Sequence, residues 1–392
     1  MLKISNSGAV KGILGLHAKD LGPKKRNTYK IILITALILI SLCASYFATV
    51  NEAYYRKTIA KVISVQEAVK ATAGDMDGDM ETVREQQIKA VIMNGAHKGE
   101  TIEFQNETSY SQAYDMELKV NDEVFISMDE SQDGKAVFSY IIDFKRDKYI
   151  AYISTIFVSL ILVIGGMKGL RSLASVAINI VIACFIIKLY SLGFNLLLVT
   201  IIASLLFIAL SISIVSGINR KAFSAIIGTM AATIITMLIT AAVILLTHSS
   251  GIRFDEMEFV TIPPEQIFTC EILIGTLGAI MDIAITICSS MHELYGRNPD
   301  IEYKALIGSG MEIGKDIMST MANTLVFAYI SGSVPMILLC LKNGYSLSHI
   351  INVNIDLEII RALVGSIGVV LSIPITLYIC VMLLKKYKIG EA

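Results

Sequence analysis

Four carboxylates lie within or beside two long apolar segments of the chain: Glu271, Asp282, Glu312 and Asp316. The first segment covers residues 267–290 and the second covers residues 316–341. An ionised carboxylate costs about 3 kcal/mol or more in the hydrocarbon of a bilayer. Segments that keep such groups therefore handle ions or substrate with them, or bury them against partners.

The small and polar residues of the first segment share one helical face. They recur every three or four residues, as a stripe along a helix requires: Glu271, Gly275, Gly278, Asp282, Thr286 and Ser289. Isoleucines such as Ile280 and Ile283 lie away from this face. Small residues let another helix approach closely, and polar ones need partners. We therefore expect this stripe to face inward, with Gly275 and Gly278 at a helix contact.

The second segment carries a similar stripe, formed by Glu312, Asp316, Ser319 and Asn323, with Gly314 as a further packing glycine. If the two helices are antiparallel neighbours, Asn323 lies about as deep as Asp282. The two stripes would then form a polar track that could pass H⁺ or Na⁺. The alternative is structural, with Asp282 paired to Asn323, Lys315 or a backbone group.

The composition excludes an ordinary soluble domain. Hydrophobic residues make up 54% of the 392 residues and charged ones only 17%, against about 25% in soluble proteins. The net charge of −1 gives no field that would attract nucleic acid.

Eight apolar segments are long enough to cross about 30 Å of hydrocarbon as helices, at residues 31–50, 149–167, 172–190, 194–216, 222–246, 266–289, 316–341 and 357–383. Basic residues gather in alternate connectors, such as the pairs Lys168/Arg171 and Arg220/Lys221. Because basic loops stay in the cytoplasm, both termini are expected there. The sequence thus predicts an all-α polytopic membrane protein, with a β-rich domain between the first two spans.

The expected domains are a basic cytoplasmic N-terminus (1–30), an anchor helix (31–50), an extracytoplasmic domain (51–148) and a seven-helix domain (149–388). The apolar part of the anchor exceeds the about 7–15 residues of a signal peptide, so we expect it to remain uncleaved.

In residues 51–148, β-branched and aromatic residues alternate with polar ones in five stretches, at residues 58–65, 86–93, 101–104, 123–128 and 136–144. Asn94-Gly95 and Asp133-Gly134 are typical of hairpin turns. Short strands with such turns indicate a small closed barrel of OB or SH3-like type.

No motif in the sequence indicates a cofactor. Asp75, Asp77 and Asp79 begin like a Ca²⁺ loop, but Met80 and Gln86 stand where that loop needs Gly and Glu. A solvated acidic turn is the favoured interpretation. The sequence contains no HExxH, P-loop, dinucleotide fingerprint or CxxC pair. We therefore expect neither a cofactor nor a metal, and no enzymatic activity.

A block of residues resembles a known family. It includes GTLGAIMD ending at Asp282, the Asn298-Pro299 connector, the run from Gly314 to Met318 and the run from Thr320 to Thr324. These features are similar to the YibE/F family of bacterial multi-pass membrane proteins. The resemblance covers nearly the whole chain and implies the architecture above, but no substrate.

The function expected from the sequence is an ion-coupled transporter or export permease in the cytoplasmic membrane. Asp282 would couple H⁺ or Na⁺ to an unknown solute, with the remaining stripe residues along the path. One alternative is a scaffold or accessory subunit whose barrel binds an envelope partner. The least favoured is an enzyme for lipid-linked substrates, with Asp282 and Asp316 as acid and base. Expected partners are the lipid bilayer and a membrane protein or further copies of the chain, but no nucleic acid.

Overall fold

The structure is a computed structural model that describes residues 23–74, 80–109, 115–130, 136–246, 263–351 and 355–389. The chain divides into two compact units, residues 1–170 and 171–392. The acidic stretch at 75–79, the Asp133-Gly134 turn and the first 22 residues lie outside the described residues.

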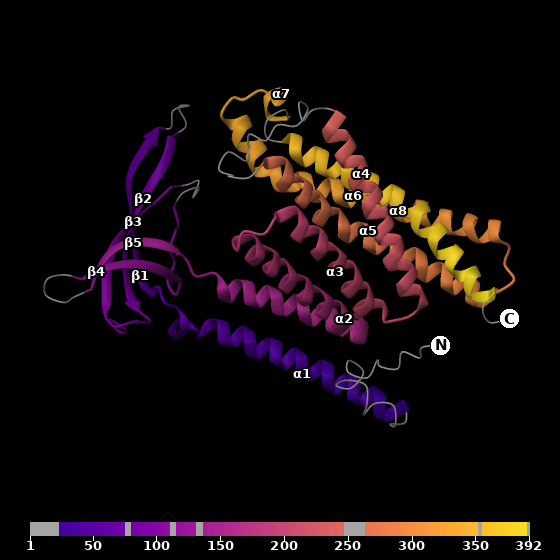
Figure 1. The fold of residues 1–392 in the computed structure, drawn as a ribbon. Coiled ribbons are helices and arrows are strands. Elements are labelled where there is room, and N and C mark those ends of the chain that lie inside the picture. Colours follow the sequence, from indigo (N-terminus) through magenta and orange to yellow (C-terminus); the bar gives the residue numbers. More distant parts are fainter. Residues whose placement is uncertain are drawn as a thin grey trace. The chain divides into compact units, whose positions relative to one another are not determined.

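The first unit contains a five-stranded antiparallel sheet with the strand order β3-β2-β1-β4-β5 (Figure 1). Its strands are β1 (Thr58–Gly74), β2 (Met80–Ile92), β3 (Thr101–Thr108), β4 (Glu123–Glu130) and β5 (Ala136–Phe144). All five predicted strands are present. β1 and β2 run further than predicted because they pair with each other as far as Gly74 and Met80.

The sheet curls into a half-barrel around an apolar core. Burial alternates along β3, so Ile102 and Phe104 face the core while their neighbours are exposed. The ring of Phe104 stacks on that of Phe138 in β5, the other edge strand, with centroids 4.1 Å apart. No backbone pairing joins β3 to β5 in the described strands. The structure therefore has a half-barrel where the sequence predicted a closed barrel.

Asn94 anchors the segment between β2 and β3, which is longer than the tight hairpin that Asn94-Gly95 predicted. Its Oδ1 accepts the backbone N–H of Ile59 at 2.7 Å. Its Nδ2 lies 2.9–3.1 Å from three carbonyl oxygens of the segment before β1, those of Glu52, Tyr55 and Lys57. One 5%-exposed side chain thus satisfies the backbone where β1 begins.

We predict that Asn94→Ala destabilises the half-barrel by about 2–4 kcal/mol, because it leaves several buried backbone groups without partners. Faster deuterium exchange in β1 of the full chain would measure this loss. Gln87→Ala, at an exposed position of β2, is the control and should change stability by less than about 0.5 kcal/mol. Equal exchange in the two variants would contradict the assignment.

α1 (Pro23–Thr49) precedes the sheet in sequence, and the short helix η1 (Glu52–Tyr54) lies between them. α2 (Asp147–Ser191) follows the sheet. Ser41 and Thr155 are joined by a 3.3 Å hydrogen bond, so α1 lies against the first part of α2.

α2 is broken at Gly166, whose φ of 54° and ψ of −129° are not helical. A Cβ at Gly169 would meet the backbone of Ile161, although eight residues of unbroken helix span about 12 Å. The chain therefore bends sharply between the second and third predicted spans.

The second unit is helical beyond the end of α2. Its helices are α3 (Leu196–Ser216), α4 (Arg220–Leu246), α5 (Pro264–Arg297), α6 (Tyr303–Lys342), the short α7 (Leu347–Ile350) and α8 (Asp356–Ile389). α8 packs against α4, α5 and α6, and α5 also packs against α3 and α4. Isoleucines of α5, with Val369 and Leu377 of α8, form the centre of the apolar core.

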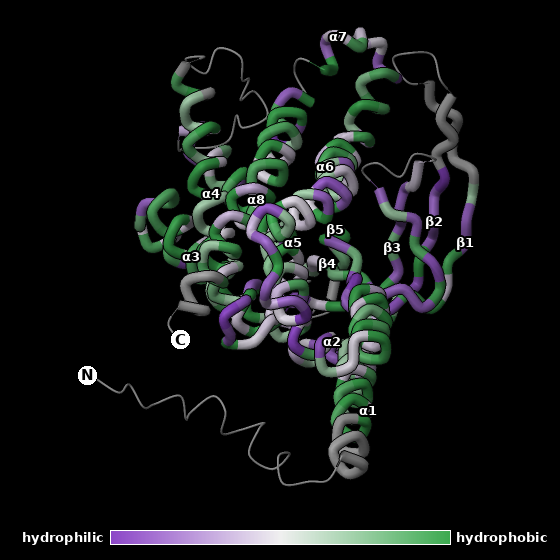
Figure 2. Tube along the Cα trace, turned by 90° about the vertical axis from the view of Figure 1, so that its right-hand side faces the viewer, coloured by the Kyte–Doolittle hydropathy of each residue, from purple (hydrophilic) through white to green (hydrophobic). Residues whose placement is uncertain are grey.

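Within the described residues, seven helices are long and apolar enough to cross a membrane. In Figure 2, hydrophobic residues predominate in these helices, whereas the strands are more polar. The sequence predicted eight spans, and α2 contains two of them, 149–167 and 172–190, with the break at Gly166 near the end of the first.

Candidate functional site

The polar stripe of α5 lies on the surface of the second unit. Glu271, Gly275, Gly278, Asp282 and Thr286 are all exposed in the chain. The buried residues are those of the opposite face, including Ile272, Ile280, Ile283 and Ile287. The expected inward orientation is therefore wrong within this unit. The physical reason is that isoleucines bury more apolar area against α3, α4 and α8 than glycines would.

Glu271 is neutralised by an arginine of α8. Arg361 donates from Nη2 to the Glu271 carboxylate at 2.6 Å and from Nη1 to Glu358. Its side chain is only 14% exposed and lies over the ring of Phe268. The Arg361 Nε is buried without a hydrogen-bond partner in the described part of the chain. Glu271 is thus held in an ion pair and is not a free carboxylate.

Asp282 differs from Glu271, since its carboxylate has no hydrogen-bond or ion-pair partner among the described residues. Thr286 donates its hydroxyl to the backbone carbonyl of Asp282 at 2.8 Å, which leaves the carboxylate itself unengaged. Lys315, one partner considered for Asp282, instead pairs with Glu312 at 2.7 Å.

The polar stripe of α6 is also on the surface. Glu312, Asp316, Ser319 and Asn323 are exposed. Glu312 has its ion pair with Lys315, whereas Asp316 has no partner among the residues that the structure describes. The stripe therefore carries one neutralised and one unpaired carboxylate.

The three packing glycines behave differently. A Cβ at Gly275 would meet the Tyr329 hydroxyl of α6, and one at Gly314 would meet Ile373 of α8. These contacts agree with the expected close approach of helices. Around Gly278 there is open space within the described chain, so the contact expected there is not found.

The Gly275 contact also sets the register of the antiparallel helices α5 and α6. Asp282 lies seven residues after Gly275 in α5, and residue 322 lies seven residues before Tyr329 in α6. Asp282 is therefore about level with Asn323, as the sequence predicted.

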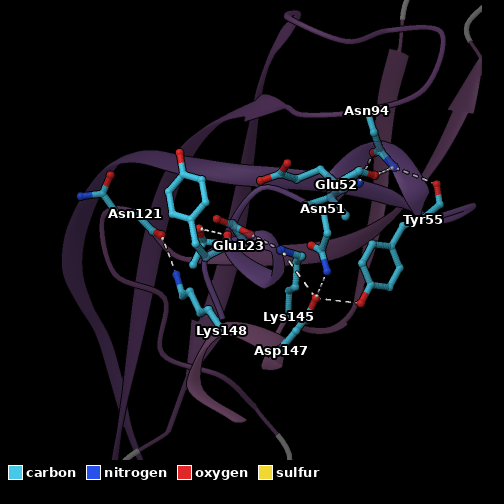
Figure 3. Close-up of polar contacts among 12 residues, drawn as sticks. Asn51, Glu52, Tyr55, Asn94, Asn121, Glu123, Lys145, Asp147 and Lys148 are labelled. Atoms are coloured by element: carbon cyan, nitrogen blue, oxygen red, sulfur yellow. Dashed lines mark hydrogen bonds and ion pairs between the residues drawn. The ribbon is translucent and has the colours of Figure 1, made fainter. Parts of the chain in front are cut away.

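A second polar cluster joins the half-barrel to the helices that flank it in sequence. We call Asn51, Tyr55, Glu123, Lys145 and Asp147 the neck network (Figure 3). The Nζ of Lys145 donates to Glu123 at 2.7 Å and lies 3.7 Å from Asp147. Asp147 also accepts hydrogen bonds from the Tyr55 hydroxyl at 2.7 Å and from the Asn51 amide at 3.0 Å. The network thus ties the chain after α1 to β4, to the end of β5 and to the start of α2.

Lys145 is completely buried, and the Glu123 side chain is 7% exposed. Burial of both charges makes this the most enclosed ion pair described in the chain. The hydrogen bond to the Asp147 carboxylate raises the pKa of Tyr55 above its usual value near 10. Tyr55 therefore keeps its proton, and the bond, throughout the neutral range.

Comparison with known protein families covers both units. Residues 153–386 match the family described as YibE/F-like protein, and residues 53–144 match the YibE/F family N-terminal domain. The chain belongs to the YibE/F family. The resemblance inferred from the residues around Asp282 is thereby confirmed. No curated protein and no solved structure matches the chain.

The two matches divide the features of this YibE/F family member between them. The half-barrel lies in the N-terminal match, and the α5 and α6 stripes lie in the larger one. Sequence reasoning missed Arg361, although Glu358 three residues earlier is the signal of a helical ion pair. Elsewhere on α5, the Nδ1 of His292 lies 2.8 Å from the Cys288 carbonyl oxygen and 3.7 Å from the Cys380 sulfur. Among the described side chains no group suited to a metal ion occurs.

Proposed function

We propose that this YibE/F family member is a multi-pass protein of the cytoplasmic membrane that moves a solute coupled to H⁺ or Na⁺. Asp282 is the coupling carboxylate. The observation that carries the proposal is the contrast among the acidic residues of α5 and α6. Glu271 and Glu312 are each ion-paired, whereas Asp282 and Asp316 have no partner among the described residues, and Asp282 lies near the middle of its apolar helix, close to Gly278, around which there is open space within the described chain.

An unpaired carboxylate within a span favours states in which its charge is neutralised. Ionised in hydrocarbon it costs about 3 kcal/mol or more, and taking up a proton or a cation removes that cost. The form of the protein in which Asp282 holds a proton or a cation is therefore stable in apolar surroundings, whereas the form with a bare carboxylate favours contact with water. Coupling requires this difference. Asn323, about level with Asp282, and Asp316, closer to the start of α6, are the groups placed to extend the path.

The proposed orientation follows the distribution of basic residues. Both termini are cytoplasmic, and residues 51–148 face the outside. The neck network then fixes the half-barrel to two membrane helices, so that the domain can receive or release solute at a defined distance from the bilayer.

The proposal predicts that Asp282→Asn lowers gradient-driven ion flux at least about tenfold, a change of 1.4 kcal/mol. Purified protein in liposomes, supplied with pooled small solutes, is given a proton or sodium gradient, and internal pH and sodium are followed. Asparagine keeps the shape of the side chain but cannot exchange a charge. Glu293→Gln, at the exposed end of the same helix, is the matched control and should retain flux. Undiminished flux in Asp282→Asn would remove the mechanism.

An accessory role is the second candidate, because the half-barrel offers a groove. The groove measures about 690 Å³, and its lining includes Gln66, Gln87, Lys89 and Glu103. Such a mixed polar surface suits an envelope protein as partner. Under this alternative, deleting the half-barrel abolishes capture of the partner, while Asp282→Asn has no effect.

A further inference from the structure

A cavity of about 370 Å³ lies between α3, α4 and α5. This volume falls within the range of small-molecule sites, which is about 300–1,000 Å³. Part of its lining is also exposed on the outside of the bundle, at Ile201, Leu205, Ile234 and Leu238. The cavity therefore opens sideways, through an apolar surface.

Two buried hydroxyl groups lie at the wall of the cavity. Ser204 of α3 and Thr233 of α4 are 3% and 5% exposed, and within the described chain their oxygens have no hydrogen-bond partner. Thr229, Thr236 and Thr276 instead donate to a carbonyl one turn earlier, whereas Thr200 and Thr376, which do not line the cavity, share the lack of a partner within the described chain. A buried polar group without a partner lowers the stability of the folded protein. Hydrogen bonds from a bound ligand to these two hydroxyls would remove that cost and so favour binding.

The remaining lining restricts the chemistry of that ligand. Apart from Ser204, Thr233, Thr269 and Cys270, the lining is apolar, and it contains no charged residue. A charged group there would be desolvated without compensation. Ser204 is also eight residues beyond the start of α3, about 12 Å along the helix. That is deeper than the headgroup of a bilayer phospholipid placed at the end of the span.

We infer that this cavity binds an uncharged amphiphile that enters from the hydrocarbon and hydrogen-bonds through one oxygen to Ser204 and Thr233. The apolar body lies against residues such as Met230, Met237 and Leu273. The site is separate from Asp282 and does not depend on the proposed ion coupling.

The test uses the full-length protein in nanodiscs and two photoreactive probes, dodecanol and dodecanoate, each carrying a diazirine. We expect dodecanol to label peptides of α3, α4 and α5 that line the cavity, in competition with unlabelled dodecanol. The double variant Ser204→Ala/Thr233→Val should reduce this labelling between about threefold and tenfold, the effect of one or two hydrogen bonds. Dodecanoate should label these peptides less than dodecanol.

Thr236→Val is the matched control, because Thr236 is a buried threonine of the same helix that bonds to Ala232 and does not line the cavity. It should leave labelling unchanged, as should Asp282→Asn. Without probe, the double variant should melt no lower than the wild type, since it removes hydroxyls that have no partner. Labelling spread evenly over all exposed apolar helices, or equal labelling of the double variant, would overturn the inference and indicate contact with bulk lipid only. A lower melting temperature of the double variant without probe would show that the hydroxyls are already satisfied, and would overturn it as well.

Discussion

Replacing Arg361 with leucine is expected to destabilise the bundle of α3 to α8 by about 2–4 kcal/mol. The change leaves Glu271 and Glu358 without their shared cation among apolar helices, and an uncompensated buried charge costs about 3–5 kcal/mol. The expected loss is smaller than this because 43% of the Glu271 side chain is exposed. The stability of Arg361→Lys should lie between those of the wild type and Arg361→Leu, since one ammonium does not reproduce the planar fork that contacts both carboxylates.

The chain itself provides the readout for this experiment. It contains no tryptophan, but the thiols of Cys270, Cys288 and Cys380 are buried and free. After replacement of Cys43, Cys184 and Cys340, which are not buried, a thiol-reactive dye therefore reports unfolding of the purified protein in detergent. Arg297→Leu is the control, because its ion pair with Glu293 is exposed on both sides and contributes about 1 kcal/mol at most. If Arg361→Leu and Arg297→Leu unfold at the same temperature, the ion pair with Glu271 does not stabilise the bundle.

Lys145→Met is expected to destabilise the half-barrel by about 3–5 kcal/mol. The substitution removes a fully buried ammonium and leaves the 7%-exposed Glu123 carboxylate unpaired. Asp147 loses a neighbouring cation at the same time. Adding Glu123→Leu to Lys145→Met should restore much of the lost stability, because a packed apolar pair replaces the ion pair without leaving a charge behind.

Deuterium exchange in β4 of the full-length protein measures this effect. The matched control is Lys89→Met, which breaks an ion pair with Glu103 of similar length, 3.0 Å, between largely exposed side chains. It should change stability by about 1 kcal/mol or less. Equal exchange in Lys145→Met and Lys89→Met would show that the neck network does not hold the half-barrel.

Local patterns predicted the secondary structure well because alternation and apolar length are properties of neighbouring residues. The five strands and the apolar helices follow from them. Closure of the sheet depends on whether the distant edge strands β3 and β5 form hydrogen bonds, and no local signal encodes that. The bend at Gly166 is similar: the sequence predicted a connector just after it, between residues 167 and 172, and the positive φ that glycine permits moved the bend into the predicted span.

The orientation of α5 could not be predicted because both of its faces have helical spacing. One face contains small and polar residues and the other contains isoleucines, so periodicity identifies two stripes without ranking them. The ion pair of Glu271 with Arg361 joins residues 90 positions apart and needs the packing of α5 against α8. Only the similar depth of Asp282 and Asn323 could be predicted, from the antiparallel arrangement of consecutive helices.

The central claim is that Asp282 lines a path for water and ions. The most direct measurement is the reaction of Asp282→Cys with a membrane-impermeant sulfonated methanethiosulfonate, after replacement of Cys43, Cys184 and Cys340, which are not buried. Leu206→Cys, an exposed apolar position in the middle of α3, is the reference. Thiolate is the reactive form and requires water. We predict modification of Asp282→Cys on the order of a hundredfold faster than Leu206→Cys. Equally slow modification of both would place Asp282 against lipid and contradict the account.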